Sequence, residues 1–598
     1  MSDERQSMDV DIVCVGFGPA MGGFLSTLAR AGDPSLQVIC YERADDIGFG
    51  VSGAVTRARG IRATFPDLNP AEIPMATAVR EEKLVYLLDP IGASRRSRTL
   101  RAADRLLRLF RRPRLDAWEL PWTPEFLRKD GGLVLSIGQF MQWTGAQIMS
   151  SGTVQIWPGM PVAEALFDES NDRVMGVRLL DQGTDSSGKP EAGYMPGMDV
   201  HAALTVVGDG PVGAVGRQLD AFVGLPDGHH QHEWAVGTKM VVELREDVDL
   251  EPGTVIHTFG YPEPEIFGFL YVQPERVATV GIFVPSWFRN PLRTSYRYLQ
   301  HYMLHPYLWR YLKGGKLRSW GAKSLQEAGK HGEPFLVGDG YARIGECSGS
   351  TNVLSGSGVD EAWTTGVQLA EAVAELRKAG KPFTKANLDE TYVARRRASW
   401  VETEGRIAEK ARDGFHHGVV SGLLGMALAG MSKGRLSIPG EPQLLPTPEQ
   451  YYRGRLTAEE IAHLRTLRVQ CNGYGLSMHD ALMDKCGWPP IPYDGSLLMS
   501  QQDALLVGGK VQAPAGYADH VRILYPDFCE ACATRLCIEM CSGQALTPGP
   551  KGVPVFDRDK CVFCGACFWN CQQPLDDDPV RTNIVFRAGA GGLHSTEN

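Results

Sequence analysis

The sequence has no run of residues long and apolar enough to span a bilayer. Residues 1–9 are polar and show no signal peptide, twin-arginine signal or arginine-rich transit segment. The chain is not basic either: 61 lysines and arginines against 70 aspartates and glutamates leave a net charge of −9. We therefore expect a chain without an export signal or a membrane span, and no binding of nucleic acid. No nucleophile triad or carboxylate pair indicates acid–base catalysis.

The length and the cysteine count suggest a large cofactor protein. A chain of 598 residues is too long for one hydrophobic core, and we expect about two to four domains. Its 43% apolar and 22% charged residues are ordinary for a folded protein. Eight of the thirteen cysteines lie between Cys529 and Cys571. A disulfide framework is unusual in a large cytosolic chain, whereas clustered cysteines at metal-ligand spacing indicate a cofactor.

The N-terminal segment has the pattern of a dinucleotide-binding βαβ unit. An apolar strand, residues 10–15, runs into Gly16-Phe-Gly18 and a helical pattern, and a second strand ends on Glu42. The first glycine allows a tight turn, the second lets the backbone approach a pyrophosphate, and the helix N-terminus stabilises the phosphate charge. Glu42 would accept hydrogen bonds from the ribose. The motif is imperfect, because Met21 stands at the third glycine position.

A second glycine run, Gly208-Asp-Gly210-Pro-Val-Gly213, fits the same pattern and could open a separate NAD domain. The residues before it, 200–204, follow a turn-rich stretch, 181–198. That order is typical of a hairpin that leads a strand back to the first nucleotide site. We favour this second interpretation.

The C-terminal cysteines form two runs of four. The runs are Cys529-x2-Cys532-x4-Cys537-x3-Cys541 and Cys561-x2-Cys564-x2-Cys567-x3-Cys571. The second has the spacing of bacterial ferredoxins, in which the fourth cysteine binds the other cluster; the first departs from it with x4 in place of x2. Crossed ligation predicts one [4Fe–4S] cluster on Cys541, Cys561, Cys564 and Cys567 and another on Cys529, Cys532, Cys537 and Cys571. Paired CxxC motifs also build zinc sites, but two complete runs favour iron–sulfur clusters.

These features resemble the electron-transfer flavoprotein–ubiquinone oxidoreductase family, and the likeness covers most of the chain. Further segments carry it: Val51-Ser-Gly-Ala54, Gly138-Gln-Phe-Met-Gln-Trp143, 314–323, 344–353 and 582–592. The run at Gly208 takes the place of a glycine turn near the flavin in that family. Of the eight cysteines, Cys541, Cys561, Cys564 and Cys567 match the single cluster of the family, and the other four have no counterpart there.

The resemblance implies a fold of the α/β and α+β classes. It would contain a Rossmann-type, glutathione-reductase-like FAD-binding domain, an inserted β-rich quinone domain and a C-terminal ferredoxin-like 4Fe–4S domain. The implied boundaries are 1–230 and 331–400 for the FAD domain, 231–330 for the quinone domain, 401–514 for a helical membrane-associating and linker region, and 515–598 for the ferredoxin-like domain.

The resemblance also implies which residues contact the cofactors. FAD would be held by Gly16, Gly18, Ala20, Glu42, Arg43, Ser52, Gly53, Ala54, Gln139, Gly208, Asp209, Gly210, Gly345, Glu346, Asn352, Gly358 and Val359. The helix that begins near Gly358 would direct its positive end at the flavin O2 and N1 region. Glu346 stands where related flavoproteins carry an aspartate that binds the ribityl or pyrophosphate part. Gly268 lies near the paired glycines that contact the quinone, although Ile266 and Phe267 replace one or both of them.

Two stretches predict contact with a membrane surface. Residues 419–431 form a short apolar run that coincides with a membrane-dipping segment of the family. Residues 95–114 hold nine arginines and one aspartate. On this second stretch Leu100, Ala103, Leu107 and Phe110 share one helical face, which is typical of an interfacial helix drawn to anionic lipids. The alternatives are a buried core helix for the first stretch and a solvated basic helix for the second.

Three histidines, His229, His230 and His232, sit close together in a Gly/Asp loop that contains no cysteine. We expect a solvated loop there rather than a metal site.

The function implied is electron transfer at a membrane surface. Electrons would come from a reduced electron-transfer flavoprotein, an α/β heterodimer, and pass through FAD and two [4Fe–4S] clusters to ubiquinone or menaquinone. The protein would be peripheral or monotopic on the cytoplasmic face of the bacterial inner membrane. Two alternatives stay open: a flavin-dependent isoprenoid reductase of the geranylgeranyl type, and an electron-relay subunit of a bifurcating flavoprotein complex. The C-terminal cysteine module favours quinone reduction over the isoprenoid reductase.

Overall fold

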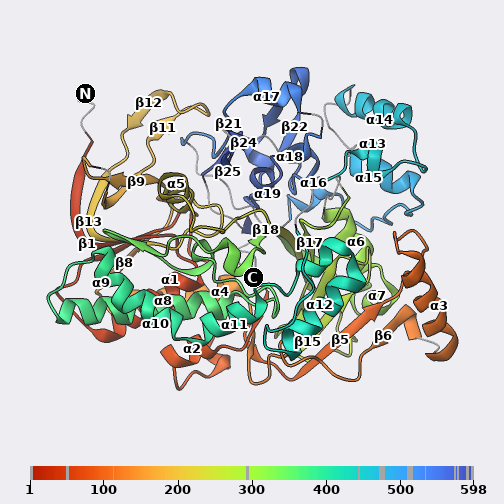
Figure 1. Cartoon of the computed structure of the whole chain (residues 1–598), viewed down its shortest axis with the longest axis horizontal. Helices are drawn as coiled ribbons and strands as arrows, with labels where there is room; N and C mark the ends of the chain where they lie inside the picture. The colour runs from red at the N-terminus through yellow and green to blue at the C-terminus, as the bar shows by residue number, and fades with distance from the viewer. Residues whose placement is uncertain are drawn as a thin grey trace.

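The structure is a computed structural model that describes residues 5–593 apart from 49–52, 112–113, 171, 291–294, 442–444, 471–477, 508–515, 533, 572–573, 576–577 and 588–591. Two eight-stranded sheets, helices packed against them and a C-terminal module of short elements make up the described chain (Figure 1). The mixed α/β class expected from the sequence is confirmed. Ser52, an expected flavin contact, lies outside the described residues.

The first sheet is built around β1 (Ser7–Val15), whose last four residues are buried. β1 has a parallel neighbour on each side, β13 (Asp199–Val207) and β2 (Val38–Tyr41). The order is β19-β20-β13-β1-β2-β8, and β10 joins β9 to β13. The remaining strands are β8 (Val154–Trp157), β9 (Val162–Phe167), β10 (Val174–Leu179), β19 (Val337–Gly338) and β20 (Tyr341–Arg343).

The expected hairpin and returning strand are confirmed. A two-stranded hairpin, β11 (Gln182–Thr184) with β12 (Pro190–Met195), precedes β13. β13 then runs parallel to β1 over its whole length, so that Gly208 follows the strand beside the first glycine turn. The second glycine run therefore belongs to the same sheet as the first and does not open a separate NAD domain.

Helices α1 (Pro19–Ala31) and α8 (Val359–Lys378) cross in direct backbone contact beneath this sheet. A Cβ on Gly23 would lie 2.3 Å from the carbonyl oxygen of Trp363, and one on Gly366 would lie 1.9 Å from that of Ala20. Real Cβ atoms do not approach backbone oxygens so closely, so only glycine permits this crossing. The contact fixes the starts of both helices relative to one another.

Replacing Gly366 by alanine should lower the thermal unfolding midpoint, because the helices would have to move apart. Overpacking of this kind costs about 1–3 kcal/mol. The matched control is Gly405→Ala in α11 (Trp400–Ala408), where the new methyl group would meet only the flexible Lys330 side chain at 3.4 Å. Scanning calorimetry of both variants measures the difference. An unchanged midpoint for Gly366→Ala would contradict the close crossing.

The second sheet has the order β27-β18-β14-β17-β16-β15-β5-β6. Its strands are β5 (Glu81–Leu87), β6 (Ala117–Glu119), β14 (Trp234–Glu243), β15 (Thr254–Phe259), β16 (Phe267–Val272), β17 (Val277–Pro285), β18 (Lys316–Gln326) and β27 (Gly592–Leu593). The sheet thus extends beyond the expected segment 231–330 and takes strands from both sides of it. β5 joins by running parallel to β15, which buries its Val85 and Leu87 in the core of this sheet.

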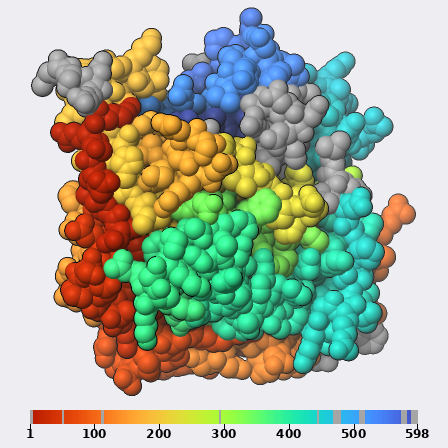
Figure 2. Space-filling model, turned by 60° about the vertical axis from the view of Figure 1, so that its left-hand side comes forward, coloured from red at the N-terminus to blue at the C-terminus, as the bar shows by residue number. Residues whose placement is uncertain are grey.

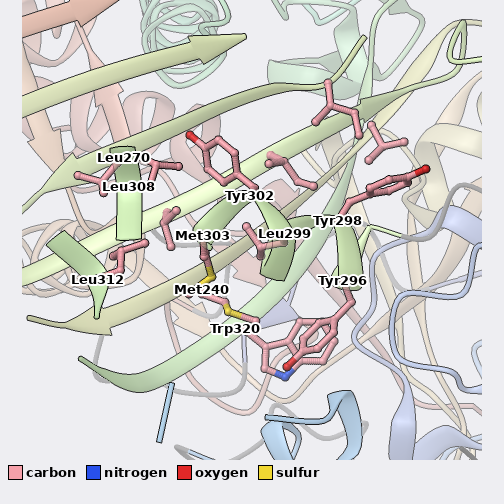
Figure 3. Packing of buried hydrophobic residues seen from close by; sticks show 14 of the residues in the cluster. Met240, Leu270, Tyr296, Tyr298, Leu299, Tyr302, Met303, Leu308, Leu312 and Trp320 are labelled. Atoms are coloured by element: carbon pink, nitrogen blue, oxygen red, sulfur yellow. The ribbon is translucent and has the colours of Figure 1, made fainter. Parts of the chain in front are cut away.

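Two short helices, α6 (Tyr296–Met303) and α7 (Pro306–Leu312), cover one face of the second sheet. Figure 3 shows their side chains meeting Met240, Leu270 and Trp320 of the strands. The residues in this cluster are buried. Each large apolar side chain removed from water contributes about 1.5–3 kcal/mol to folding stability. The core on this face therefore stabilises the sheet, whose other face is left free of these helices.

The basic helix expected from the sequence is α3 (Arg98–Arg111), at the edge of the second sheet. Asp104 anchors it by ion pairing with Arg96 at 2.8 Å and by accepting the Tyr86 hydroxyl at 2.8 Å. The outward apolar face differs from the expected one. Leu100 and Leu107, on the anchored face with Asp104, are half-buried, and Leu106 and Leu109 are the exposed leucines, at 56% and 76%. The side chain of Phe110 lies outside the described residues.

The C-terminal module contains short helices and two-stranded sheets. The helices are α17 (Pro526–Ala531), α18 (Leu536–Glu539) and α19 (Ala566–Trp569). The sheets pair β21 (Val521–Ile523) with β26 (Ile584–Phe586), β22 (Leu546–Pro548) with β23 (Pro554–Phe556), and β24 (Pro574–Leu575) with β25 (Asp578–Thr582). The module, blue in Figure 2, lies against the β11–β12 hairpin. Backbone bonds join them, from Thr184 N to Gly516 O at 3.0 Å and from Asp519 N to Ser186 O at 2.9 Å.

Candidate functional site

A cavity of about 1390 Å³ lies between the first sheet and the uncovered face of the second. It brings together nearly all the predicted cofactor contacts. Those that line it are Gly16, Gly18, Ala20, Glu42, Arg43, Gly53, Ala54, Gly208, Asp209, Gly210, Gly345, Glu346, Asn352, Gly358, Val359 and, on the second sheet, Gly268. Gln139 does not line it; its N–H donates to Ser136 Oγ at the start of α4 (Ile137–Met149), from which Ile137 and Met141 reach the wall.

The glycine turn after β1 leaves space where a phosphate would sit. Gly16 has a φ of +81°, and a Cβ there would lie 3.0 Å from Gly208 O. Gly18 caps α1 without any side chain, and no atom lies within 4 Å of the position that its Cβ would take. The positive end of α1 therefore faces open cavity, which is the arrangement that binds anionic groups. The residues present fit a dinucleotide.

Glu42 is held in place by backbone N–H groups at the end of β2. Its Oε2 accepts from Phe17 N at 2.8 Å and its Oε1 from Ala44 N at 2.9 Å. A carboxylate has about four acceptor positions, so lone pairs remain for the hydroxyl groups of a ribose. The position on the cavity wall agrees with the role expected for an acid at this point.

One carboxylate oxygen of Asp209 is used within the protein and is not free to contact a ligand. Oδ2 accepts from Val215 N at 2.9 Å and Gly216 N at 3.0 Å, and so caps α5 (Ala214–Val223). Burial raises the pKa of this carboxyl to about 6, although the two N–H groups oppose the shift. Its main structural role is to fix α5 beside the turn formed by Gly208 and Gly210.

The start of α8 forms the opposite end of the cavity. Asn352 Oδ1 accepts from Leu354 N at 3.1 Å and Ser355 N at 3.0 Å, which shapes the turn that leads to Gly358. Gly358 gives α8 no side-chain cap, so its first N–H groups and its positive end are available to an anionic group in the cavity. In the first turn, buried Glu361 accepts the Ser357 hydroxyl at 2.7 Å, and burial raises its pKa to about 7.

Two lysines lie on the wall between these ends. Lys323 pairs with Glu346, whose other oxygen accepts from Gln326 N at 3.2 Å. Lys239 of β14 donates to Gly53 O at 2.8 Å, and burial lowers its pKa to about 7. Sequence reasoning missed Lys239; the available signal was a lysine within an otherwise apolar strand.

The second sheet gives the cavity an aromatic wall, which includes Phe267, Phe269, Tyr271 and Phe283. Packing explains why a glycine stands at position 268, because a Cβ there would lie 2.5 Å from the ring of Tyr302 on the far side of the sheet. A quinone contact at Gly268 stays a prediction. The aromatic wall suits a flat apolar ring, because apolar surfaces make up most of a small-molecule site.

At one end of the cavity the lining includes Trp122, which is 62% exposed, and residues of α12 (Val419–Met431). One face of α12 is buried through residues such as Gly422 and Met426, while Val420, Leu424 and Met431 are exposed. Within the described part of the chain no helix combines the length and the apolar character needed to cross a bilayer. The exposed apolar face of α12 therefore lies beside an end of the cavity.

Four cysteines line a second, small cavity in the C-terminal module: Cys541, Cys561, Cys564 and Cys567. This is the set that crossed ligation predicts for one cluster. Ala545 N donates to Cys541 Sγ at 3.1 Å, and His520 Nε2 lies 3.2 Å from Cys561 Sγ. Hydrogen bonds to sulfur are a main means by which proteins tune cluster potentials.

The other four cysteines lie near one another as well. Burial raises the pKa of the Cys529 thiol, and the charges of Cys571 and Cys532 act in the same direction. Burial also raises the pKa of Cys537 well above its usual value, and the same three cysteines add to it. Among the residues that the structure describes, no group of three or more His, Cys, Asp or Glu side chains has the spacing to hold a metal ion.

Arg43 connects the two cavities. It lines the large cavity, and its guanidinium lies 4.5 Å from the centre of the Phe563 ring. Phe563 N in turn donates to Cys561 Sγ at 3.4 Å. A backbone bond of 2.9 Å from Ser324 N to Cys564 O joins the second sheet to the same loop. The first cysteine set therefore adjoins the large cavity through direct contacts.

The histidine loop is partly solvated, as expected, because His232 is exposed, but His229 and His230 are half-buried and make contacts that the sequence did not indicate. The ring of His230 stacks on those of His232 and His331, with centres 5.5 and 5.7 Å apart. His229 Nδ1 lies 2.6 Å from the carbonyl oxygen of Glu333. The partner His331 lies about a hundred residues further along the chain, so the local sequence gave no sign of it.

Comparison with known proteins finds one matching family model and several relatives that share a name. A family model described as "ETF-QO, ubiquinone-binding" matches residues 234–325. The electron transfer flavoprotein-ubiquinone oxidoreductase of Pseudomonas aeruginosa is 29% identical over 411 residues, which cover 67% of this chain and 69% of that protein. The mitochondrial protein of the same name from Dictyostelium discoideum is 28% identical over 441 residues, 71% of this chain and 68% of its own.

Among solved structures, a geranylgeranyl bacteriochlorophyll reductase-like protein from Thermoplasma acidophilum is similar over 80% of this chain and all of its own, at 16% identity and a TM-score of 0.49. The segment matched by the family model, 234–325, runs from β14 to β18 and so forms the sheet that walls the large cavity. The relatives extend the match over about two thirds of the chain. Over that length the chain is similar to the electron transfer flavoprotein-ubiquinone oxidoreductases, and the family model for their ubiquinone-binding segment matches its second sheet.

Proposed function

We propose that this protein transfers electrons from a reduced electron-transfer flavoprotein, through FAD and two [4Fe–4S] clusters, to a quinone in a membrane. The observation that carries the proposal is the large cavity, which joins a dinucleotide-type glycine turn to an aromatic wall within the matched quinone-binding segment. The match to that segment favours quinone reduction over an isoprenoid reductase. The relatives named for this activity in P. aeruginosa and D. discoideum support the same choice.

The direct test is reduction of a short-chain quinone analogue driven by reduced electron-transfer flavoprotein, followed by the absorbance of the quinone. We expect turnover that depends on both the flavoprotein and this protein. Omitting either component is the control. If the complete mixture reduces quinone no faster than the flavoprotein alone, the proposal is wrong. Native purification also tests the alternative of a relay subunit, which would co-elute with further subunits.

FAD would lie along the large cavity. Its pyrophosphate would meet the N-terminus of α1 at Gly18, and its ribose hydroxyls would meet Glu42. Bound FAD would supply a carrier that exchanges electrons singly or in pairs. The N-terminus of α8 would stabilise negative charge in the cavity, and Lys239 would do so in its protonated form. The aromatic wall would exclude water from the same region.

The C-terminal module would act as a ferredoxin-like domain with two clusters in crossed ligation. The set that lines the small cavity would lie nearest the large cavity, since it adjoins Arg43 and Ser324. The second set, which contains Cys529 and Cys571, has no counterpart in the family that the sequence resembles. An added cluster would lengthen the relay or store a further electron before the quinone is reduced.

We further propose that the protein lies on the surface of the membrane that holds the quinone, at the cytoplasmic face of a bacterial inner membrane. The exposed apolar face of α12 adjoins an end of the large cavity, which gives an apolar substrate a route that avoids water. The arginines of α3, together with exposed Leu106 and Leu109, suit an anionic lipid surface.

Replacing Arg98 and Arg105 by glutamate should reduce co-sedimentation with vesicles that contain anionic phospholipid. Both side chains are exposed on α3, and each basic residue near such a surface contributes about 1 kcal/mol. Reversing two charges should therefore weaken binding by more than about tenfold. The matched control reverses exposed Lys189 and Lys378, which lie outside α3. Equal binding of both double variants would favour the solvated-helix alternative.

A further inference from the structure

A hydrogen-bonded pair of titratable side chains, His257 and Glu82, lies on the wall of the large cavity. His257, on β15, lines the cavity, and its Nε2 lies 2.8 Å from Oε1 of Glu82 on the neighbouring strand β5. The other Glu82 oxygen accepts from Lys129 N at 2.9 Å. The side chains of the pair are 15% and 5% exposed. Because Nε2 is occupied by Glu82, Nδ1 is the ring nitrogen available to a molecule in the cavity.

The groups that face this pair define its resting state. They are Lys129 from the loop before β7 (Leu133–Leu135) and Tyr271 from β16, whose ring centre is 6.2 Å from that of the imidazole. Burial lowers the pKa of His257. Burial opposes ionisation of Glu82, but the bonds from His257 and Lys129 outweigh it and lower the pKa of that carboxyl. At neutral pH the pair therefore consists of a neutral imidazole that donates its Nε2 proton to a carboxylate.

The position of the pair matters because of its neighbours on the wall. His257 pairs with Phe269 across the two strands, and Thr258 pairs with Gly268. Phe269 and Phe283 have no exchangeable proton. Burial raises the pKa of Tyr271, so its hydroxyl is a poor proton donor at neutral pH. A quinone against this aromatic wall would take up two protons with its two electrons to become a quinol. A titratable side chain on the same wall could supply the two protons.

We propose that the His257–Glu82 pair delivers protons to a quinone reduced in this cavity. The inference rests on the proposed function. As electrons from the reduced flavoprotein reach the quinone, the growing negative charge favours protonation of the imidazole, and the Glu82 carboxylate stabilises the imidazolium. Nδ1 then passes its proton to a quinone oxygen. Water supplies the proton that the imidazole takes up before each transfer. After two electrons and two such transfers the quinone has become a quinol, and the imidazole is neutral again, as in the resting state.

The test uses the holoprotein reduced by light and mixed with either a short-chain quinone or ferricyanide, which accepts electrons without protons. His257→Ala should slow reoxidation by quinone by about 100-fold, the usual contribution of general acid catalysis. Its reoxidation by ferricyanide should be unchanged. Added imidazole should restore part of the quinone reaction, because the truncated side chain leaves room on the wall of an open cavity. Such a rescue would not follow from a purely structural role.

Glu82 acts through His257 and is a positioning residue. Glu82→Gln keeps an acceptor for Nε2 but removes the charge that stabilises the imidazolium. Since the reaction needs the protonated imidazole, the fall in quinone reduction with rising pH should begin at a lower pH in this variant. The matched control is His416→Ala, which removes an equivalent 3.0 Å pair with Glu233 at a position that does not line the cavity.

Each result is decisive. If quinone reoxidises the wild type and His257→Ala equally fast, the proton-delivery role is wrong and the proposed function stands. If His257→Ala loses the ferricyanide reaction as well, His257 supports the fold or the electron path, and the proton-delivery role is again wrong. If quinone does not reoxidise the reduced wild type at all, the proposed function itself fails.

Discussion

Purified without oxygen, this protein should contain about eight irons and eight acid-labile sulfides per chain, in two [4Fe–4S] clusters. The family that it resembles would give half that content. The expectation rests on the two cysteine sets, one of which lines its own cavity while the other four lie near one another. Iron and sulfide analysis measures the content, and electron paramagnetic resonance of the reduced protein reports whether two interacting clusters are present.

Single serine variants should separate the two sets. Cys541→Ser and Cys537→Ser should each lower the iron content to about four per chain, because each removes one ligand from a different cluster. Cys541→Ser should impair quinone reduction more, since its set adjoins the large cavity through Phe563 and Arg43. The control is Cys486→Ser, a half-buried cysteine outside both sets. About four irons in the wild type, with none lost from Cys537→Ser, would show that the extra set binds no cluster.

Gly18→Asp should abolish stable binding of FAD. The space beside Gly18 is open, so the chain can accept the side chain, but the new carboxylate would occupy the place of the pyrophosphate and repel it at the start of α1. A loss of more than about 3 kcal/mol in binding free energy, or more than about 100-fold in affinity, should leave a colourless protein after gel filtration.

Gly18→Ala is the matched control for this variant. It adds one methyl group at the same open position without a charge, so FAD binding should weaken much less than in the aspartate variant. Thermal unfolding without added FAD checks that both variants remain folded. If the aspartate variant kept stoichiometric FAD, the pyrophosphate would have to lie elsewhere in the cavity.

The sequence was most informative where local chemistry determines the structure. An apolar run, two glycines and an acid at the end of the next strand predicted β1, α1 and β2, because each element follows from residues within about thirty positions of one another. The hairpin before β13 was likewise predicted by its turn residues. The cysteine spacing predicted which four would share a cavity, and the structure places those four around one.

Features that depend on distant parts of the chain could not be predicted in the same way. Nothing around residues 81–87 shows that β5 will lie parallel to β15, since that pairing is decided by the shape of a sheet formed much later in the sequence. The outward face of α3 was predicted wrongly because helical spacing says which residues share a face, but the contacts of Asp104 decide which face turns inward. His257 and Glu82 meet across that same distant pairing.

The second sheet includes β5 near residue 81 and β27 near residue 592. About five hundred residues therefore have to be made after β5 before β27 can join this sheet. Until then, newly made strands have unpaired edges, and the many long-range pairings make assembly slow. Because the large cavity is lined by residues from Val15 to Arg587, insertion of a cofactor there should come late in biogenesis, after the C-terminal module has been made. Expression at lowered temperature with added iron should then give a larger fraction of cofactor-containing protein than rapid expression at a higher temperature.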